Sequence, residues 1–159
     1  MKVRNGVIIV FFLWAANTLP ALGNTNQPSD SLALMYYQEA DSLLLFNRYD
    51  SARKYLLLAE EFYGLDENWE GYINTKNKLS EYHAALFDLS QAETEARAAL
   101  KLARQYLGEG SPQEAEALSN IGNVHYLTGQ HNIALENFQA ALAITERLDE
   151  QESEFRYSA

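Results

Sequence analysis

The amino-acid sequence predicts an all-α protein, folded as a right-handed α-solenoid of three helix–turn–helix repeats. The main observation is a pattern of small residues that returns about every forty residues. Pairs of alanines at positions i and i+7 recur, and each pair follows another small residue at i−12. The second observation is the spacing i, i+3, i+4, i+7 of larger apolar residues, which gives each helix one apolar face. The alternative is a generic helical bundle in which the alanine spacing arises by chance.

The first 23 residues have the layout of a secretory signal peptide. Lys2 and Arg4 form a positive start, an apolar run covers residues 7–16, and small residues precede a cleavage position after Gly23. The apolar run is too short for a transmembrane helix, which needs about twenty residues. An uncleaved membrane anchor is the alternative interpretation. We therefore expect an exported protein, periplasmic or secreted, in which residues 24–30 form a short flexible leader.

The repeat register assigns ten residues to packing between helices. Nine of them have small side chains, which let neighbouring helices approach one another closely, and the tenth is an aromatic residue. The assigned packing residues are Ala40, Ala52, Ala59, Ser80, Ala92, Ala99, Gly122, Ala134, Phe138 and Ala141. The turn between the two helices of a repeat falls at Asn47 in the first repeat, at Phe87 in the second and at Gly129 in the third.

The layout resembles the tetratricopeptide repeat (TPR), which has a large residue, Leu-Gly, a Tyr-like position, a turn Gly, and then Ala, an aromatic and Ala. The third repeat carries this pattern as Leu118, Ile121, Gly122, His125, Gly129, Ala134, Phe138 and Ala141. The resemblance covers residues 33–66, 73–106 and 115–148 of an array at 31–150, and residues 151–159 form a polar tail. The long spacing and the stretch 99–108 resemble kinesin-light-chain-like repeats. Glu39 and Phe87 depart from the family pattern.

The boundary before the third repeat is marked most clearly. Gly108 and Gly110 end one helix. Ser111 is a suitable N-cap, and Pro112 fits the first helical position. Glu114 is expected to complete a capping box with Ser111.

The chain is acidic and has no cysteine. It contains 12 basic and 22 acidic residues, and the loss of Lys2 and Arg4 with the signal leaves a net charge of −12. This charge argues against nucleic acid and against an anionic membrane surface as partners. It suits a soluble protein or one with a basic partner. Without disulfides, helix packing alone must hold the fold.

No catalytic constellation, cofactor motif or metal motif is found in the sequence, so we expect a protein that is not an enzyme. His83 and His125 fall at the same repeat position, and we interpret both as packing residues. His131, at the start of a second helix, has the same interpretation. An enzyme with an unrecognised site is the remaining alternative.

The TPR resemblance implies that the first helix of each repeat lines a concave groove. Carried onto this sequence, it gives the candidate peptide-binding residues Tyr37, Asn77, Asn120, Asn123 and Tyr126. Asparagine both donates and accepts hydrogen bonds, so it can pair with an extended peptide backbone. Tyrosine adds rigid aromatic surface. The alternative is that these polar groups are merely solvated.

The predicted function is an exported, non-enzymatic TPR scaffold that binds a peptide or protein segment in its groove. The family's carboxylate clamp is not expected, because the positions that need Lys and Arg hold Tyr37, Glu116 and Asn120. A groove that contains Asp41, Glu81 and Glu116 would instead disfavour an acidic C-terminus. We expect no polar cap helix after the third repeat, so its last apolar face is available for a homodimer. The alternative is that the chain is the N-terminal sensor or oligomerisation region of a larger bacterial signalling protein.

Overall fold

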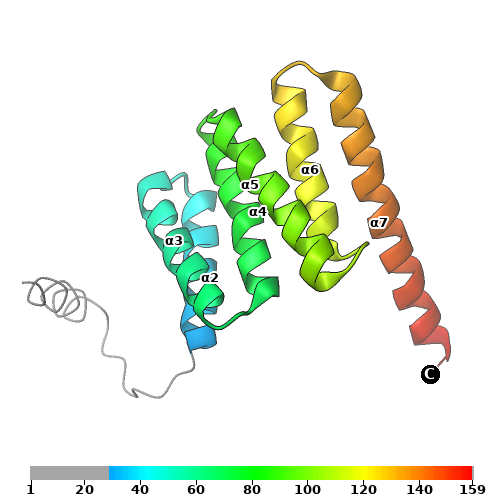
Figure 1. Ribbon diagram of the computed structural model, residues 1–159, viewed down its shortest axis with the longest axis horizontal. Coiled ribbons are helices and arrows are strands. Elements are labelled where there is room, and N and C mark those ends of the chain that lie inside the picture. The colour runs from blue at the N-terminus through cyan, green and yellow to red at the C-terminus, as the bar shows by residue number, and fades with distance from the viewer. Residues whose placement is uncertain (1–28, 159) are drawn as a thin grey trace, which may run out of the picture.

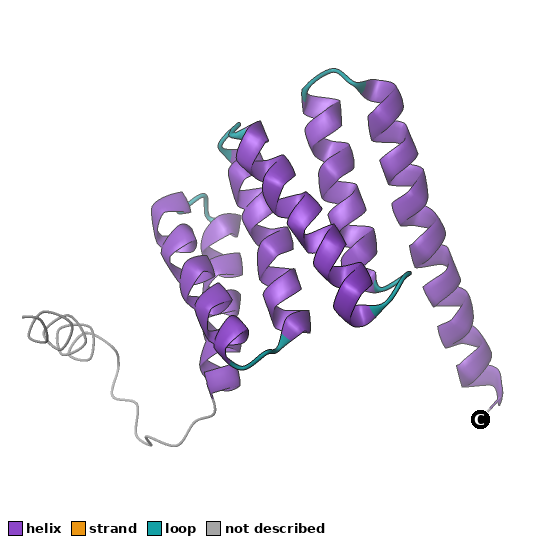
Figure 2. Ribbon diagram, viewed as in Figure 1, coloured by secondary structure: helices purple, strands orange, loops and turns teal. Residues whose placement is uncertain are grey.

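The computed structural model describes residues 29–158, including every side chain except those of residues 29, 154, 155, 157 and 158. The predicted signal peptide and most of the predicted leader lie outside the described residues. Figures 1 and 2 show a row of antiparallel helix pairs joined by short turns. The elements are α2 (Ser29–Leu45), α3 (Tyr49–Leu65), α4 (Trp69–Ala85), α5 (Leu89–Leu102), the π-helix η1 (Ala103–Leu107), α6 (Pro112–Leu127) and α7 (His131–Ser158). No strand occurs within residues 29–158. The predicted all-α solenoid is confirmed.

The helices form two rows. Within the described chain, Cα atoms less than 8 Å apart link α2 to α4 and α4 to α6, whereas none link α3 to α5 or α5 to α7. Figure 1 shows α3 and α5 in front of α2 and α4. The first helices of the repeats therefore form a tight inner row, and the second helices form an outer row that spreads apart. Such a difference in spacing bends a solenoid toward its inner row.

Small residues allow the close packing within each helix pair. Among the residues assigned to packing, the alanines at positions 40, 52, 59, 92 and 99 are 0% exposed. Ser80, Ala134 and Ala141 are at most 5% exposed, and Gly122 is also buried. A Cβ atom on Gly122 would lie 2.8 Å from the ring of Phe138, so only glycine lets this ring approach. Phe138 itself is 39% exposed, because its other side faces no further helix in the described chain.

The three turns inside the repeats have one backbone geometry. Asn47, Phe87 and Gly129 all have positive φ, at 56°, 59° and 78°. In each turn two successive N–H groups donate to carbonyls of the last helical turn, for example Phe87 to Ala84 and Asp88 to His83. This is the usual left-handed helix ending, which glycine or asparagine adopts most easily. Phe87 adopts it despite its bulky side chain, which is 75% exposed.

The boundary before the third repeat follows the prediction with one difference. Ser111 caps α6 through its side chain, which accepts from the Glu114 N–H, and Pro112 begins the helix. The Glu114 carboxylate does not complete the capping box as expected. It accepts instead from the N–H of Gly110 at 2.5 Å and from Nε of Arg104 at 2.8 Å. The carboxylate therefore bonds to the N–H of the residue before the N-cap and not to the N–H of the N-cap itself. Gly110, whose φ is positive, and the Arg104 guanidinium both donate to it.

Candidate functional site on the inner row of helices

The inner row carries a charged cluster built from three helices. Asp41 comes from α2, Lys78 and Glu81 come from α4, and Glu116 comes from α6. The Nζ atom of Lys78 lies 3.1 Å from Oδ1 of Asp41 and 2.8 Å from Oε2 of Glu81. The Lys78 side chain is only 15% exposed, whereas the carboxylates of Asp41 and Glu81 are almost half exposed. The lysine therefore lies in the floor of the cluster and the carboxylates line its rim.

The environment of the cluster shifts the pKa of three groups. Burial lowers the pKa of Lys78, but the hydrogen bonds and charges of Glu81 and Asp41 outweigh it and hold this pKa above its ordinary value. Burial, followed by the charge of Glu81, raises the pKa of Glu116. Burial raises the pKa of Tyr37 to about 12, and nearby carboxylates add to the effect. The lysine is thus charged and the tyrosine neutral at pH 7.

A hollow of about 220 Å³ opens beside this cluster. It combines carboxylates with apolar and aromatic surface, and its lining residues are Asp41, Leu44, Leu45, Tyr49, Lys78, Glu81 and Ala85. Both helices of the first repeat and the first helix of the second contribute to it. A side chain with an apolar stem and a positively charged end matches this lining.

Two of the three predicted groove asparagines join neighbouring helices of the inner row. Asn77 is 0% exposed. Its Nδ2 donates to the carbonyl of Gln113 at 3.1 Å and to Oε2 of Glu116 at 3.2 Å. Nδ2 of Asn120 donates to the Asn77 carbonyl at 3.2 Å. The amide N–H groups of Asn77 are thus occupied within the fold, and its Oδ1 has no partner in the described part of the chain.

The remaining predicted groove residues are more accessible. Asn123 is exposed, and Tyr126 is 58% exposed with its ring 5.4 Å from that of His131. Tyr37 is half-buried beside the charged cluster. The structure therefore brings Tyr37 and Asn77 to the cluster and places Asn123 and Tyr126 farther along α6. Peptide binding by these residues stays a prediction.

The repeat-equivalent histidines contact other side chains of the fold. Nδ1 of His83 lies 3.5 Å from Asp88, and its ring packs edge-on against Tyr82. His125 is 8% exposed, and its Nε2 lies 3.9 Å from Glu93. No group of three or more His, Asp or Glu side chains within residues 29–158 is arranged to hold a metal ion.

The structure also shows contacts that the sequence did not reveal. The rings of Trp69 and Tyr106 stack at 4.0 Å with 7° between their planes. Tyr106 reaches Trp69 from η1, where α5 widens into a π-helix. Lys76 joins Glu60 to Glu95 and so links α3, α4 and α5. In the sequence, residues 99–108 are marked only by their resemblance to kinesin-light-chain-like repeats, which implies none of these contacts.

Comparison with known proteins agrees with the geometry. A family model described as tetratricopeptide repeat matches residues 71–147, which run from α4 to α7. Residues 71–147 therefore belong to the tetratricopeptide-repeat family. The match begins after the first repeat, whose sequence is also the loosest fit to the family pattern. No curated protein matches the chain.

A solved structure supports the same assignment for most of the chain. It is described as the crystal structure of BtubC (BKLC) from P. vanneervenii, and this TPR protein is similar to it with a TM-score of 0.67 and 25% sequence identity. The similarity covers 85% of this chain but 52% of that one, so this chain spans about half the length of BtubC. The predicted likeness to kinesin-light-chain-like repeats is in keeping with this neighbour.

Tetratricopeptide repeats generally mediate protein–protein interaction, and the family is generally non-enzymatic. Between residues 29 and 158, no helix combines the length and the apolar character needed to cross a bilayer.

Proposed function

We propose that this TPR protein is an exported, non-enzymatic scaffold that binds a peptide or protein segment along its inner row of helices. The observation that carries the proposal is the charged hollow shared by α2, α3 and α4. Its residues come from two repeats, so a segment lying in it contacts a surface that only the assembled solenoid offers. TPR membership supports a protein partner in general terms.

The charge of the inner row favours a segment with positively charged side chains. Asp41, Glu81 and Glu116 surround the single cation Lys78, which leaves the cluster with an excess of two negative charges when all three are ionised. Complementary charge steers a partner and fixes its register more than it adds affinity. Farther along α6, the exposed Tyr126 offers an aromatic anchor and Asn123 offers a free amide.

The groove proposal is tested with peptides selected from a random library displayed on phage, using immobilised protein of residues 24–159. A selected peptide is then titrated calorimetrically into the wild type, into Asp41→Asn/Glu81→Gln and into Asn123→Ala/Tyr126→Ala. We expect each double variant to weaken binding about tenfold. Gln139→Ala, on the exposed side of α7, is the matched control and leaves affinity unchanged. Equal affinity in all four proteins would reject the inner row as the binding surface.

Export is tested separately, because it rests on residues 1–23. The full chain and a chain starting at residue 24 are expressed in a bacterium with a periplasm, and the periplasmic fraction is assayed for each. We expect only the full chain there, with a new N-terminus after Gly23. Retention of the uncleaved full chain in the membrane fraction would support the anchor alternative instead.

A second candidate function is oligomerisation, and the exposed apolar stripe of α7 favours it. Leu135, Phe138 and Leu142 are 55%, 39% and 56% exposed. Leu56 and Ala96 hold the position of Phe138 in the earlier repeats, and both are 0% exposed because α4 or α6 covers them. Sedimentation velocity of residues 24–159 measures the assembly. A dimer that Leu142→Glu converts to a monomer supports this function, and a monomer at every concentration contradicts it.

A further inference from the structure

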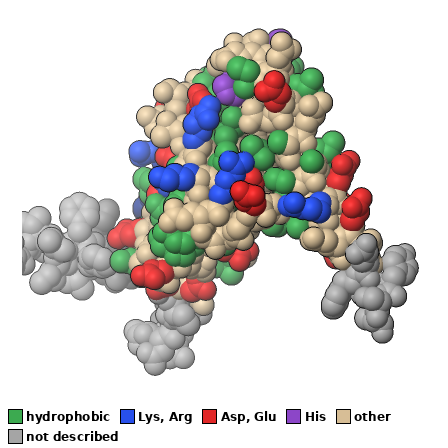
Figure 3. Space-filling view, turned by 45° about the vertical axis from the view of Figure 1, so that its right-hand side comes forward, with side chains coloured by type: hydrophobic (Ala, Val, Ile, Leu, Met, Phe, Trp, Pro, Cys, Tyr) green, Lys and Arg blue, Asp and Glu red, His purple; other side chains and the backbone are tan. Residues whose placement is uncertain are grey.

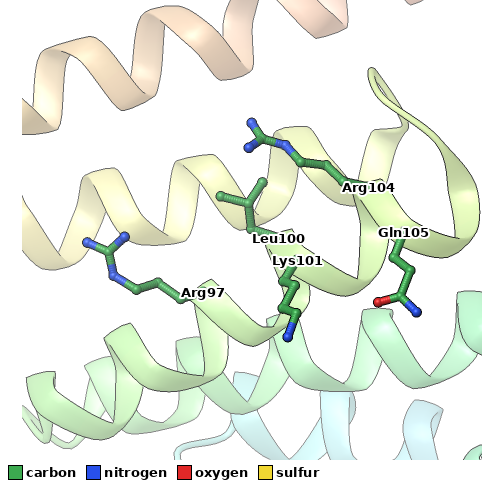
Figure 4. Close-up of a pocket in the computed structure, with 5 residues that line it drawn as sticks. All are labelled: Arg97, Leu100, Lys101, Arg104 and Gln105. Atoms are coloured by element: carbon green, nitrogen blue, oxygen red, sulfur yellow. The ribbon is translucent and has the colours of Figure 1, made fainter.

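A basic hollow lies on the outer row, away from the inner cluster. It has a volume of about 470 Å³ and is lined by Arg97, Leu100, Lys101, Arg104 and Gln105, all from α5 and the adjoining η1 (Figure 4). Figure 4 shows Arg97, Leu100 and Arg104 extending toward α6 and α7, and Lys101 and Gln105 extending the other way. Figure 3 shows that Lys and Arg side chains on this side of the molecule alternate with apolar ones.

The cations of this hollow lie above their own carboxylate partners. Nε and the terminal nitrogen of Arg97 lie 2.8 Å and 2.6 Å from Oε1 of Glu93. The arginine side chain is 57% exposed and the glutamate 35%. Arg104 lies 2.8 Å from Glu114, and here the exposed fractions are 50% and 6%. The guanidinium groups are therefore held in place from below, and their outer sides face solvent.

Lys101 and Leu100 complete the surface. Lys101 is exposed and makes no ion pair within the described chain. Leu100 is half-buried and packs against the cluster of Ala115, Leu118 and Ala141, so it gives the hollow an apolar floor. An ion pair of Lys101 with an incoming carboxylate would replace no pair of the folded chain.

The repeat register shows that the other two repeats carry no cations at these positions. Arg97, Lys101 and Arg104 correspond to Leu57, Glu61 and Gly64 in the first repeat and to Gln139, Ala143 and Glu146 in the third. None of these six counterparts is basic, although α3 and α7 occupy equivalent places in the solenoid. The basic surface is therefore a property of the second repeat, on a protein whose net charge is strongly negative.

We propose that this hollow is a second binding surface, which takes an acidic segment of a partner protein with one apolar residue between its carboxylates. The carboxylates pair with the exposed guanidinium groups and with Lys101, and the apolar residue rests on Leu100. Charge complementarity on a net negative protein selects the partner, since an acidic segment is repelled elsewhere on the surface. Because this surface lies on the outer row, the proposal does not depend on peptide binding along the inner row.

The test is fluorescence anisotropy of protein 24–159 with a short fluorescein-labelled peptide of Glu, Asp and Leu. A second peptide has Gln and Asn in place of the acids. We expect the acidic peptide to bind about tenfold more tightly than its amide counterpart, and added NaCl to weaken it. Arg97→Gln/Lys101→Gln should lower its affinity about tenfold. Arg104 is left unchanged because it supports the buried Glu114.

The matched control is Arg53→Gln/Lys54→Gln, which removes two exposed cations from the outer helix of the first repeat. We expect it to bind the acidic peptide like the wild type. Thermal melts followed by circular dichroism check that both variants are folded. Equal loss in the two variants would overturn the proposal in favour of unspecific charge attraction. So would equal binding of the two peptides. Self-association abolished only by Arg97→Gln/Lys101→Gln, without peptide binding, would assign the hollow to a second copy and overturn the acidic partner.

Discussion

The inner and outer rows of helices use their polar side chains in different ways. On the inner row, bonds cross from one helix to the next, as between Lys78 and Asp41 or between Asn77 and Gln113. On the outer row, Arg97 pairs with Glu93 four residues away on its own helix. The inner polar groups therefore help to fix the spacing of the repeats, whereas the Arg97–Glu93 pair leaves that spacing unaffected. Substitutions of polar side chains on the two rows should therefore differ in their effect on stability.

The largest expected effect is that of Asn77→Ala on the inner row. The change removes the donor to the Gln113 carbonyl and to Glu116 at a fully buried position. We expect the free energy of unfolding to fall by about 2 kcal/mol, because a hydrogen bond to a neutral carbonyl contributes about 0.5–1.5 kcal/mol and one to a charged carboxylate about 1.5–3 kcal/mol. The orphaned Oδ1 disappears with the same change, which keeps the cost below the upper limit. Urea denaturation followed by circular dichroism measures it.

Asn123→Ala is the control for this prediction. It replaces the same residue type on an inner-row helix and brings the same gain in helix propensity, but its side chain is exposed. We expect its stability to stay within about 0.5 kcal/mol of the wild type. Similar losses in the two variants would show that burial does not distinguish these asparagines.

The next effect in size concerns the cations of the two rows. Lys78→Met removes a charge that is 15% exposed and leaves Asp41 and Glu81 facing Glu116. We expect a loss of about 1 kcal/mol, which is less than for a fully buried pair because both carboxylates reach solvent. Arg97→Met removes an exposed cation, and we expect about 0–0.5 kcal/mol. A greater loss for Arg97→Met would contradict the division between the rows.

The sequence predicted the repeats and their turns because both depend on local patterns. Ala52 and Ala59 mark one face of a helix by their spacing alone, and Gly129 marks a left-handed turn by its lack of a side chain. The environment of Asn77 could not be predicted in this way. Its register position indicates an inner-row residue, but its partners are a carbonyl and a carboxylate contributed by α6, some 40 residues later. Atoms of another repeat decide whether such a side chain is buried.

The sequence likewise does not show which charged side chains form ion pairs in the fold. Arg97, Lys101 and Arg104 are visible in the sequence as basic residues along one helix. That Glu114 lies beneath Arg104, while Lys101 is unpaired in the described chain, depends on how α6 meets α5. The sequence therefore indicated the fold and the inner row, and the three-dimensional contacts distinguished structural polar groups from accessible ones.

A smaller effect is expected at Phe87, in the turn that joins the inner helix α4 to the outer helix α5. A non-glycine residue in the left-handed region carries strain of about 1 kcal/mol, and this side chain is 75% exposed, so it buries little surface in return. We expect Phe87→Gly to raise the free energy of unfolding by about 0.5 kcal/mol once the added flexibility of the unfolded chain is subtracted. Chemical denaturation measures the change, and Gly129→Ala at the equivalent turn should have the opposite sign.

The smallest expected effect is the pH dependence contributed by Glu116. Burial and the charge of Glu81 raise the pKa of this carboxyl in the folded protein, so the folded state binds the proton more tightly than the unfolded chain does. Its stabilising contribution is complete below the ordinary pKa of glutamate and is lost as the pH rises through the raised folded value. Glu116→Gln keeps an acceptor for Asn77 without this charge. We therefore expect the free energy of unfolding of the variant, relative to that of the wild type, to increase between pH 4 and pH 7. Urea denaturation at a series of pH values measures it.

On the outer row, Glu136→Gln replaces an exposed carboxylate and is the matched control for the change of charge. A rising trend in both variants would show that the charge of the whole protein, rather than the inner cluster, sets the pH dependence.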